Sequence, residues 1–264
     1  MAISLDKLAR TAPGLVNLAK GAQVNLTKRG LAGHRAKVAL CLDHSGSMRK
    51  LYKQGVVQAL AERVLALATQ IDDDGAIDVF AFGAEGSYLG ELTVADFAGG
   101  VDRLIRDMRY GTTNYAAVME LVRAHYRSGG LSTSPAASHS ATPESQLGRQ
   151  VSVIAGHVLT RPAELPAYVM FVTDGAPDSR SKAARQIVEA SREGIFWQFM
   201  GVGGGPFDFL RRLDASVPGR LIDNAGFFEA TDPTELADDA LYAEMLSEYP
   251  SWLREAKRAG VLRG

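Results

Sequence analysis

Short side chains that carry oxygen recur at three points of the sequence, and their types suit the binding of a divalent cation. Asp43, Ser45 and Ser47 directly follow one apolar run, and Asp174 directly follows another. Thr113 lies between them in the chain, before a stretch with helical spacing. Taken singly, each of these residues is most simply a helix cap or a turn residue. Together they offer five hard oxygen donors, which are the ligands that Mg²⁺, Mn²⁺ or Ca²⁺ prefers.

The elements that must position these donors alternate along the chain. Continuous apolar runs predict two strands buried on both faces, at Val38–Leu42 and Tyr168–Val172. Further strands are predicted at 77–82, 88–92, 195–202 and 220–222, and helices at 51–67, 97–108, 118–126, 182–193, 207–214, 234–246 and 251–259. This alternation predicts an α/β fold with a doubly wound, Rossmann-like, mostly parallel sheet and helices on both faces. Ligands of such sheets bind beyond the carboxyl ends of the strands, where the five donors are expected.

Composition and pattern divide the chain into three parts. Residues 1–36 are expected to be a leader segment, in which the alternation of Val24–Thr27 predicts a strand. Residues 37–230 hold the α/β domain, and a Ser-, Ala-, Pro- and Thr-rich stretch at 128–147 predicts a mobile loop within it. Residues 231–264 are expected to form a C-terminal helical segment.

The totals exclude several classes of protein. Lys and Arg number 29 against 30 Asp and Glu, so no broad basic field is available for nucleic acid. No stretch approaches the roughly 20 apolar residues of a membrane span, and the first ten residues lack the apolar run of a signal peptide. Cys41 is the single cysteine, which excludes an intramolecular disulfide. We expect a cytoplasmic protein that binds neither nucleic acid nor membrane.

Other chemical signals are weaker. The glycine run at 201–206 ends in Pro206 where a dinucleotide motif has its last glycine, so a loop is predicted there. His44 stands beside the proposed cation as a candidate base or ligand, but alternation along a tight loop favours an exposed side chain. The sequence has no phosphate loop, nucleophile elbow or zinc-spaced His/Cys set. Because Asp43 and Asp174 are committed as ligands, no acid–base pair remains, and we expect no enzymatic activity.

The joint pattern resembles the metal-ion-dependent adhesion site (MIDAS) of von Willebrand factor A (vWA) domains, over residues 37 to about 225. The resemblance implies that Ser45 and Ser47 bind the cation directly, and that Asp43, Thr113 and Asp174 bind directly or through water. With only two carboxylates in the set, a bound Mg²⁺ stays electrophilic, and a partner's Asp or Glu completes its coordination. The surface expected to meet that partner comprises His44, Met48, Gly111 and Ala176–Ser179.

A narrower resemblance concerns the two ends of the chain. Val24–Lys28 is similar to the opening of TerD-like tellurium-resistance proteins. Together with Lys37–Ser47, Phe196–Gly201 and Tyr249–Leu253, it resembles the TerF-like vWA proteins of bacterial tellurite-resistance and stress clusters. This implies a non-enzymatic, metal-dependent protein-binding module of a stress-response system. The alternative is a metal-assisted phosphoester hydrolase in which the cation acts as a Lewis acid.

Overall fold

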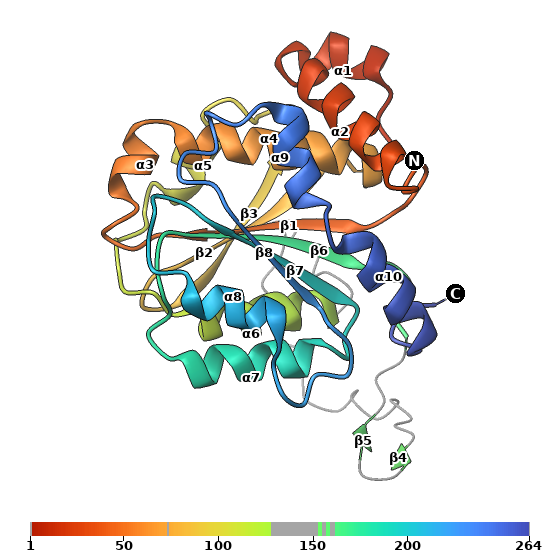
Figure 1. Cartoon of the computed structure of the whole chain (residues 1–264). Helices are drawn as coiled ribbons and strands as arrows, with labels where there is room; N and C mark the ends of the chain where they lie inside the picture. The colour runs from red at the N-terminus through yellow and green to blue at the C-terminus, as the bar shows by residue number, and fades with distance from the viewer. Residues whose placement is uncertain (1, 73, 128–152, 155–156, 159–161, 264) are drawn as a thin grey trace, which may run out of the picture.

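The computed structural model describes residues 2–72, 74–127, 153–154, 157–158 and 162–263. Within them a central sheet has the strand order β3-β2-β1-β6-β7-β8 (Figure 1), in which only β3 runs antiparallel to its neighbour. The strands are β1 (Lys37–Asp43), β2 (Ala76–Phe82), β3 (Gly86–Thr93), β6 (Ala167–Thr173), β7 (Ile195–Gly201) and β8 (Ala225–Glu229). A separate short pair is formed by β4 (Val153–Ile154) and β5 (His157–Val158).

Helices cover both faces of the sheet (Figure 1), which confirms the predicted doubly wound α/β fold. One face carries α4 (Val56–Ile71), α9 (Asp238–Met245) and α10 (Tyr249–Arg258). The other carries α6 (Tyr115–Arg127), α7 (Arg180–Ala190) and α8 (Asp208–Ala215). The remaining helices are α1 (Leu5–Thr11), the 3₁₀ helix η1 (Pro13–Leu15), α2 (Val16–Lys28), α3 (Arg49–Lys53) and α5 (Gly100–Ile105).

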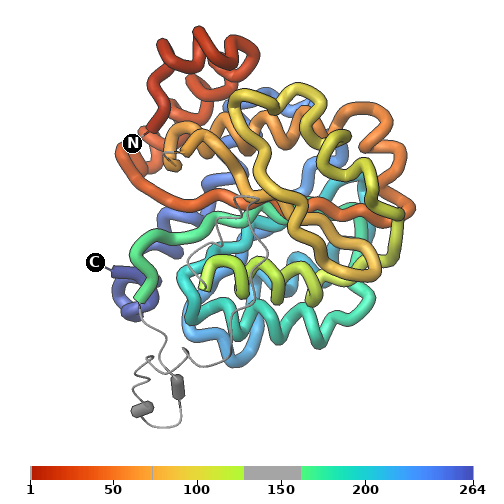
Figure 2. Tube along the Cα trace, turned by 180° about the vertical axis from the view of Figure 1, so that it is seen from behind, coloured from red at the N-terminus to blue at the C-terminus, as the bar shows by residue number. Residues whose placement is uncertain are grey.

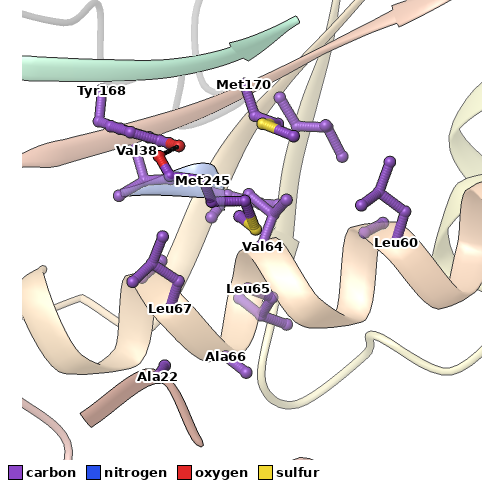
Figure 3. Packing of buried hydrophobic residues seen from close by; sticks show 14 of the residues in the cluster. Ala22, Val38, Leu60, Val64, Leu65, Ala66, Leu67, Tyr168, Met170 and Met245 are labelled. Carbon is purple, nitrogen blue, oxygen red and sulfur yellow. Dashed lines mark hydrogen bonds between the residues drawn. The ribbon is translucent and has the colours of Figure 1, made fainter. Parts of the chain in front are cut away.

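The helix α4 is buried on two sides, and its mostly apolar second half, from Val64 to Ile71, is buried around the whole circumference. Figure 3 shows Leu60, Val64 and Leu67 turned towards side chains of the sheet, while Ala66 faces Ala22 of α2. A helix that is hydrophobic all round has to be enclosed, and here the N-terminal helices provide the outer cover. Residues 2–36 therefore pack into the same core cluster as β1 and α4.

The strand predicted at Val24–Thr27 is wrong, because these residues lie in α2. Helical periodicity extends over a longer stretch than the local alternation, since Leu15, Ala19, Ala22 and Leu26 are all buried while Val24 is exposed. The helix is also held to α9, where Asn25 Nδ2 donates a 2.7 Å hydrogen bond to Asp239 Oδ1. The alternation of apolar and polar residues over only the four positions of Val24–Thr27 does not distinguish a strand from one face of a helix.

Two further element predictions need correction. The last strand is β8 and not Arg220–Ile222, because the Arg220 guanidinium donates to the carbonyl groups at the end of α8 and Leu221 is exposed. The single helix predicted over 51–67 is divided into α3 and α4 at Gly55, whose φ is 75°. The predicted mobile loop at 128–147 lies outside the described residues. Among the helices that are described, none is long and apolar enough to cross a membrane.

Candidate metal centre

The topology of the sheet brings Asp43 and Asp174 to one edge. β1 and β6 are parallel neighbours in register from Lys37↔Ala167 to Leu42↔Val172. The chain passes from β1 to β2 on one side and later enters β6 on the other, so the strand order reverses between β1 and β6. Parallel α/β sheets bind ligands at such a point, beyond the carboxyl ends of the strands.

Asp43 is fully buried and its carboxylate is held in one orientation. Its Oδ1 accepts a 2.8 Å hydrogen bond from the backbone N–H of Ser45, and its Oδ2 accepts one of 2.6 Å from Thr173 Oγ1. Tyr115 OH lies 2.9 Å from Thr173 Oγ1 and 2.5 Å from the carbonyl oxygen of Gly175, to which it donates. Both carboxylate oxygens therefore accept hydrogen bonds from the protein, which fixes the orientation of the carboxylate.

A row of three oxygen atoms continues from this carboxylate towards solvent. Ser45 Oγ lies 3.1 Å from Ser47 Oγ, and Ser47 Oγ donates a 2.9 Å hydrogen bond to Asp174 Oδ1. Adjacent ligands of an octahedral Mg²⁺ are separated by about 2.9 Å, given metal–oxygen distances of roughly 2.0–2.1 Å. The spacing of neighbouring oxygen atoms in this row is therefore close to the edge of an octahedral site. Within the described residues no cluster of three or more His, Cys, Asp or Glu side chains offers an alternative metal site.

Thr113 lies on the loop next to this row. The backbone N–H of Gly111 donates a 3.1 Å hydrogen bond to the carbonyl of His44. Asp178 accepts at Oδ1 from the backbone N–H of Thr113 at 3.1 Å and at Oδ2 from Thr112 Oγ1 at 2.6 Å. No hydrogen bond among the described residues joins the half-buried Thr113 hydroxyl to the other four donors. The structure therefore brings Asp43, Ser45, Ser47 and Asp174 into one connected set, with Thr113 beside it on a loop fixed by Asp178.

Glycine is required where these loops touch. A Cβ at Gly111 would lie 2.5 Å from the backbone nitrogen of Ala84, and one at Gly205 would overlap the carbonyl oxygen of Asp174. Both contacts are with backbone, which cannot rotate away as a side chain can. The glycine run at 201–206 is mostly a loop, as predicted, and it lies against Asp174.

Burial raises the pKa values of the two carboxylates at the site, those of Asp43 and Asp174. Desolvation raises the pKa of Asp43 to about 6, although the hydrogen bonds from Thr173 and Ser45 act in the opposite direction. Burial also raises the pKa of Asp174, against the hydrogen bond from Ser47. Two carboxylates in a poorly solvated position are costly as anions, and a cation beside them offsets that cost.

His44 is buried, so the prediction of an exposed histidine is wrong. Its ring stacks on Tyr110 with centroids 4.1 Å apart, and its Nδ1 lies 3.3 Å from the carbonyl oxygen of Arg109. The backbone N–H of His44 donates to the carbonyl of Phe82 in β2, so the pairing of β1 with β2 continues for one residue, and the ring packs on Tyr110, which lies far along the chain. Met48 and Pro177 are also buried, so three residues of the predicted partner surface are inaccessible. Ser47, Thr112 and Asp178 are exposed at the site.

Sequence reasoning also missed the residues that support the ligands. Thr173 and Tyr115 hold Asp43, Tyr52 OH donates to the carbonyl of Asp43 at 2.9 Å, and Asp178 fixes the Thr113 loop. Thr173 stands directly before a predicted ligand at the end of a predicted strand, which is a usable signal. The tyrosines carry no such signal, because an aromatic residue on an apolar helix face is ordinarily a core residue.

Comparison with known proteins defines the family. The family model of the vWA domain found at the C terminus of TerF matches residues 35–138 and 137–262. An uncharacterized protein of Bacillus subtilis strain 168, YcbR, is 36% identical over 249 residues, which cover 92% of this chain and 88% of that protein. The chain therefore belongs to the TerF-like family of vWA domains.

Solved structures agree on the fold. A von Willebrand factor type A protein from Catenulispora acidiphila matches with a TM-score of 0.50 and 15% identity over 81% of this chain and 42% of that one. Proximal thread matrix protein 1 from the mussel byssus matches with a TM-score of 0.51 and 14% identity over 81% of this chain and 48% of its own. The chain thus spans less than half the length of either protein. At these identities the likeness concerns the fold alone.

Proposed function

We propose that this chain is a non-enzymatic protein-binding module that holds a divalent cation at a MIDAS and uses it to bind a carboxylate of a partner protein. The observation that carries the proposal is the row of Ser45 Oγ, Ser47 Oγ and Asp174 Oδ1, with neighbours 3.1 and 2.9 Å apart beyond the ends of β1 and β6. Mg²⁺ is the cation we favour, and Mn²⁺ and Ca²⁺ share its preference for oxygen. The proposed ligands are Asp43, Ser45, Ser47, Thr113 and Asp174.

The donor set explains why such a cation recruits a partner. Ser45, Ser47 and Thr113 contribute neutral hydroxyls, so Asp43 and Asp174 bring the only two formal negative charges. A divalent cation on these ligands is roughly neutralised and retains an open position with affinity for another carboxylate. A partner's Asp or Glu fills that position. Hydrogen bonds from Thr173 and Ser45 keep the Asp43 carboxylate in a fixed orientation at the site.

Family membership and the leader resemblance support a role in a bacterial tellurium-resistance or stress-response system in the cytoplasm. The near balance of charges, with 29 basic and 30 acidic residues, favours a protein partner over nucleic acid.

Metal-dependent retention tests the proposal. The immobilised full chain is exposed to a lysate in Mg²⁺, and bound proteins are eluted with EDTA and identified by mass spectrometry. Proteins recruited through the cation are eluted by EDTA, return when Mg²⁺ is restored, and are absent from Ser47→Ala and Thr113→Ala columns. Retention that persists equally in EDTA contradicts recruitment through a cation.

An enzyme assay separates the module from the metal-assisted hydrolase. The purified chain is incubated with p-nitrophenyl phosphate in Mg²⁺ and in Mn²⁺. We expect no turnover, because His44, the candidate base beside the proposed cation, is buried against Tyr110 and cannot reach a substrate. Turnover that is lost in Asp43→Ala would replace the binding module with a hydrolase.

A further inference from the structure

Exposed cationic side chains flank the proposed metal site on two stretches of the chain. The helix α3 begins two residues after Ser47, and the segment 106–110 leads directly into Gly111. On these two stretches five exposed cations stand against one exposed acid, Asp107; the cations are Arg49, Lys50, Lys53, Arg106 and Arg109. No ion pair among the described residues involves any of the five. We call these five residues the basic rim.

The two stretches lie side by side in space. In Figures 1 and 2, which view the molecule from opposite sides, the chain after α5 runs beside α3. The contact between them is specific, because the Arg49 guanidinium carbon lies 4.6 Å from the centroid of the Tyr110 ring. Tyr110 in turn stacks on His44, the residue between Asp43 and Ser45.

This stack makes Arg49 the best-placed residue of the rim. A guanidinium seated on a ring face gains a cation–π interaction, and its N–H groups at the edge stay available for a carboxylate, which they bind in bidentate fashion. No hydrogen bond from the Arg49 guanidinium is present among the described residues. Arg49 is therefore ordered by an aromatic contact and uncommitted in its hydrogen bonding.

The basic rim also supplies a longer-range positive potential, which the metal site lacks. A divalent cation on two carboxylates has little net charge, so it attracts a partner only at contact distance. The rim adds positive potential that acts over about a Debye length, roughly 8 Å at physiological salt. Such fields steer a complementary segment and select against neutral or basic ones.

We infer that the partner of this site is an acidic protein segment, in which one carboxylate binds the cation and a second binds Arg49 within the basic rim. This inference rests on the proposed function, because cation and rim then act on the same segment. It extends that function by specifying the chemistry of the partner beyond a single Asp or Glu.

Peptide binding to the full chain tests the inference. The probes are short Gly/Ser peptides that contain no acid, a single Asp, or the same Asp flanked by Glu residues; an oligothymidylate serves as the nucleic-acid comparison. Affinities are measured by NMR titration in Mg²⁺ and in EDTA. We expect the flanked peptide to bind about fivefold more tightly than the single-Asp peptide, the upper range for an exposed ion pair. Arg49→Ala and high salt should remove this advantage.

The matched control is Arg254→Ala, which removes an exposed arginine on α10 that has no ion pair among the described residues. It should keep the advantage of the flanked peptide in full. If Arg49→Ala keeps it as well, or if the oligothymidylate binds more tightly than the flanked peptide, the inference is overturned.

A calorimetric Mn²⁺ titration without peptide separates this inference from the proposed function. If Mn²⁺ binds but the flanking acids add no affinity, the acidic-segment inference fails and the metal site stands. If Mn²⁺ does not bind but the flanked peptide still binds more tightly and this depends on Arg49, the proposed metal site is wrong. The inference that the cation and the basic rim bind the same segment is then wrong as well.

Discussion

Thr173 Oγ1 donates a 2.6 Å hydrogen bond to Oδ2 of Asp43, and this bond joins the last residue of β6 to the last residue of β1. Tyr115 OH lies 2.9 Å from the same threonine oxygen and donates to the carbonyl of Gly175, so two hydroxyls pack behind the buried carboxylate. Residues that hydrogen-bond to a metal ligand commonly change the metal affinity by about 10- to 100-fold when they are replaced. The strand ends thus supply both the proposed ligand and the group that holds it.

Thr173→Val should weaken divalent-cation binding by about tenfold, the lower range for the loss of a hydrogen bond behind a ligand. Valine keeps the shape of threonine but leaves Asp43 Oδ2 without its donor, and the pKa of Asp43, which this bond lowers, rises further. Calorimetric titration with Mn²⁺ measures the change. The control is Thr69→Val, which removes another buried hydroxyl, in α4. Equal affinities for the two variants contradict a role for Thr173 at the site.

Gly111→Ala should lower the free energy of unfolding by about 1–3 kcal/mol, the usual cost of overpacking. The new Cβ would meet the Ala84 backbone nitrogen at 2.5 Å and force the loops at the metal site apart. Gly46→Ala is the matched control in the neighbouring loop, since nothing lies within 4 Å of its Cβ position and its φ is not positive. Urea titration compares the two variants. Similar losses for both would show that the close approach of residue 111 to the Ala84 backbone is not what requires glycine.

Asp43→Asn should stabilise the metal-free protein at alkaline pH while abolishing metal binding. Burial raises the pKa of Asp43 from 3.8 to about 6, so the folded protein retains a proton there that the unfolded chain has released. The neutral carboxyl stabilises the fold below pH 3.8, and that contribution is lost as the pH rises through about 6. We expect a gain of about 1–3 kcal/mol near pH 8 in EDTA and little gain near pH 4. A variant less stable than the wild type at both pH values would contradict this account.

Leu15→Ala should cost about 2–5 kcal/mol, as expected for a large side chain removed from a packed core. Leu15 is fully buried in the cluster that also contains α4 and β1 residues, although it lies within the first 36 residues. Leu221→Ala is the control, because Leu221 is 44% exposed. Thermal unfolding of the full chain reports both. A negligible loss for Leu15→Ala would show that the N-terminal helices contribute nothing to the stability of the domain.

The sequence was most informative where one pattern persisted over a whole element. The apolar runs at 38–42 and 168–172 predicted β1 and β6 because strands covered on both faces cannot alternate. The strand-end rule then predicts Asp43 and Asp174 on one edge of the sheet from the sequence alone. Asp43, Ser45, Ser47 and Asp174 indeed form one connected set.

Prediction failed where distant parts of the chain decided the outcome. Val24–Thr27 reads as a strand locally, but its environment is α4 and α9. The burial of His44 depends on Tyr110, 66 positions further along the chain, and the contact of Arg49 with the same ring was equally invisible. The hydrogen bonds of Asp178 to the Thr113 loop likewise join residues that no local pattern relates.

The position of the cation is the most direct test of the central claim. Crystals of the full chain grown with Mn²⁺ would be measured at the manganese absorption edge, and an anomalous difference map would locate the ion. The account predicts one strong peak at bonding distance from Ser45 Oγ and Ser47 Oγ, near Asp43, Thr113 and Asp174, that is absent from crystals of Asp43→Ala. A manganese peak elsewhere, or no peak at these hydroxyls in well-ordered crystals saturated with Mn²⁺, would contradict it.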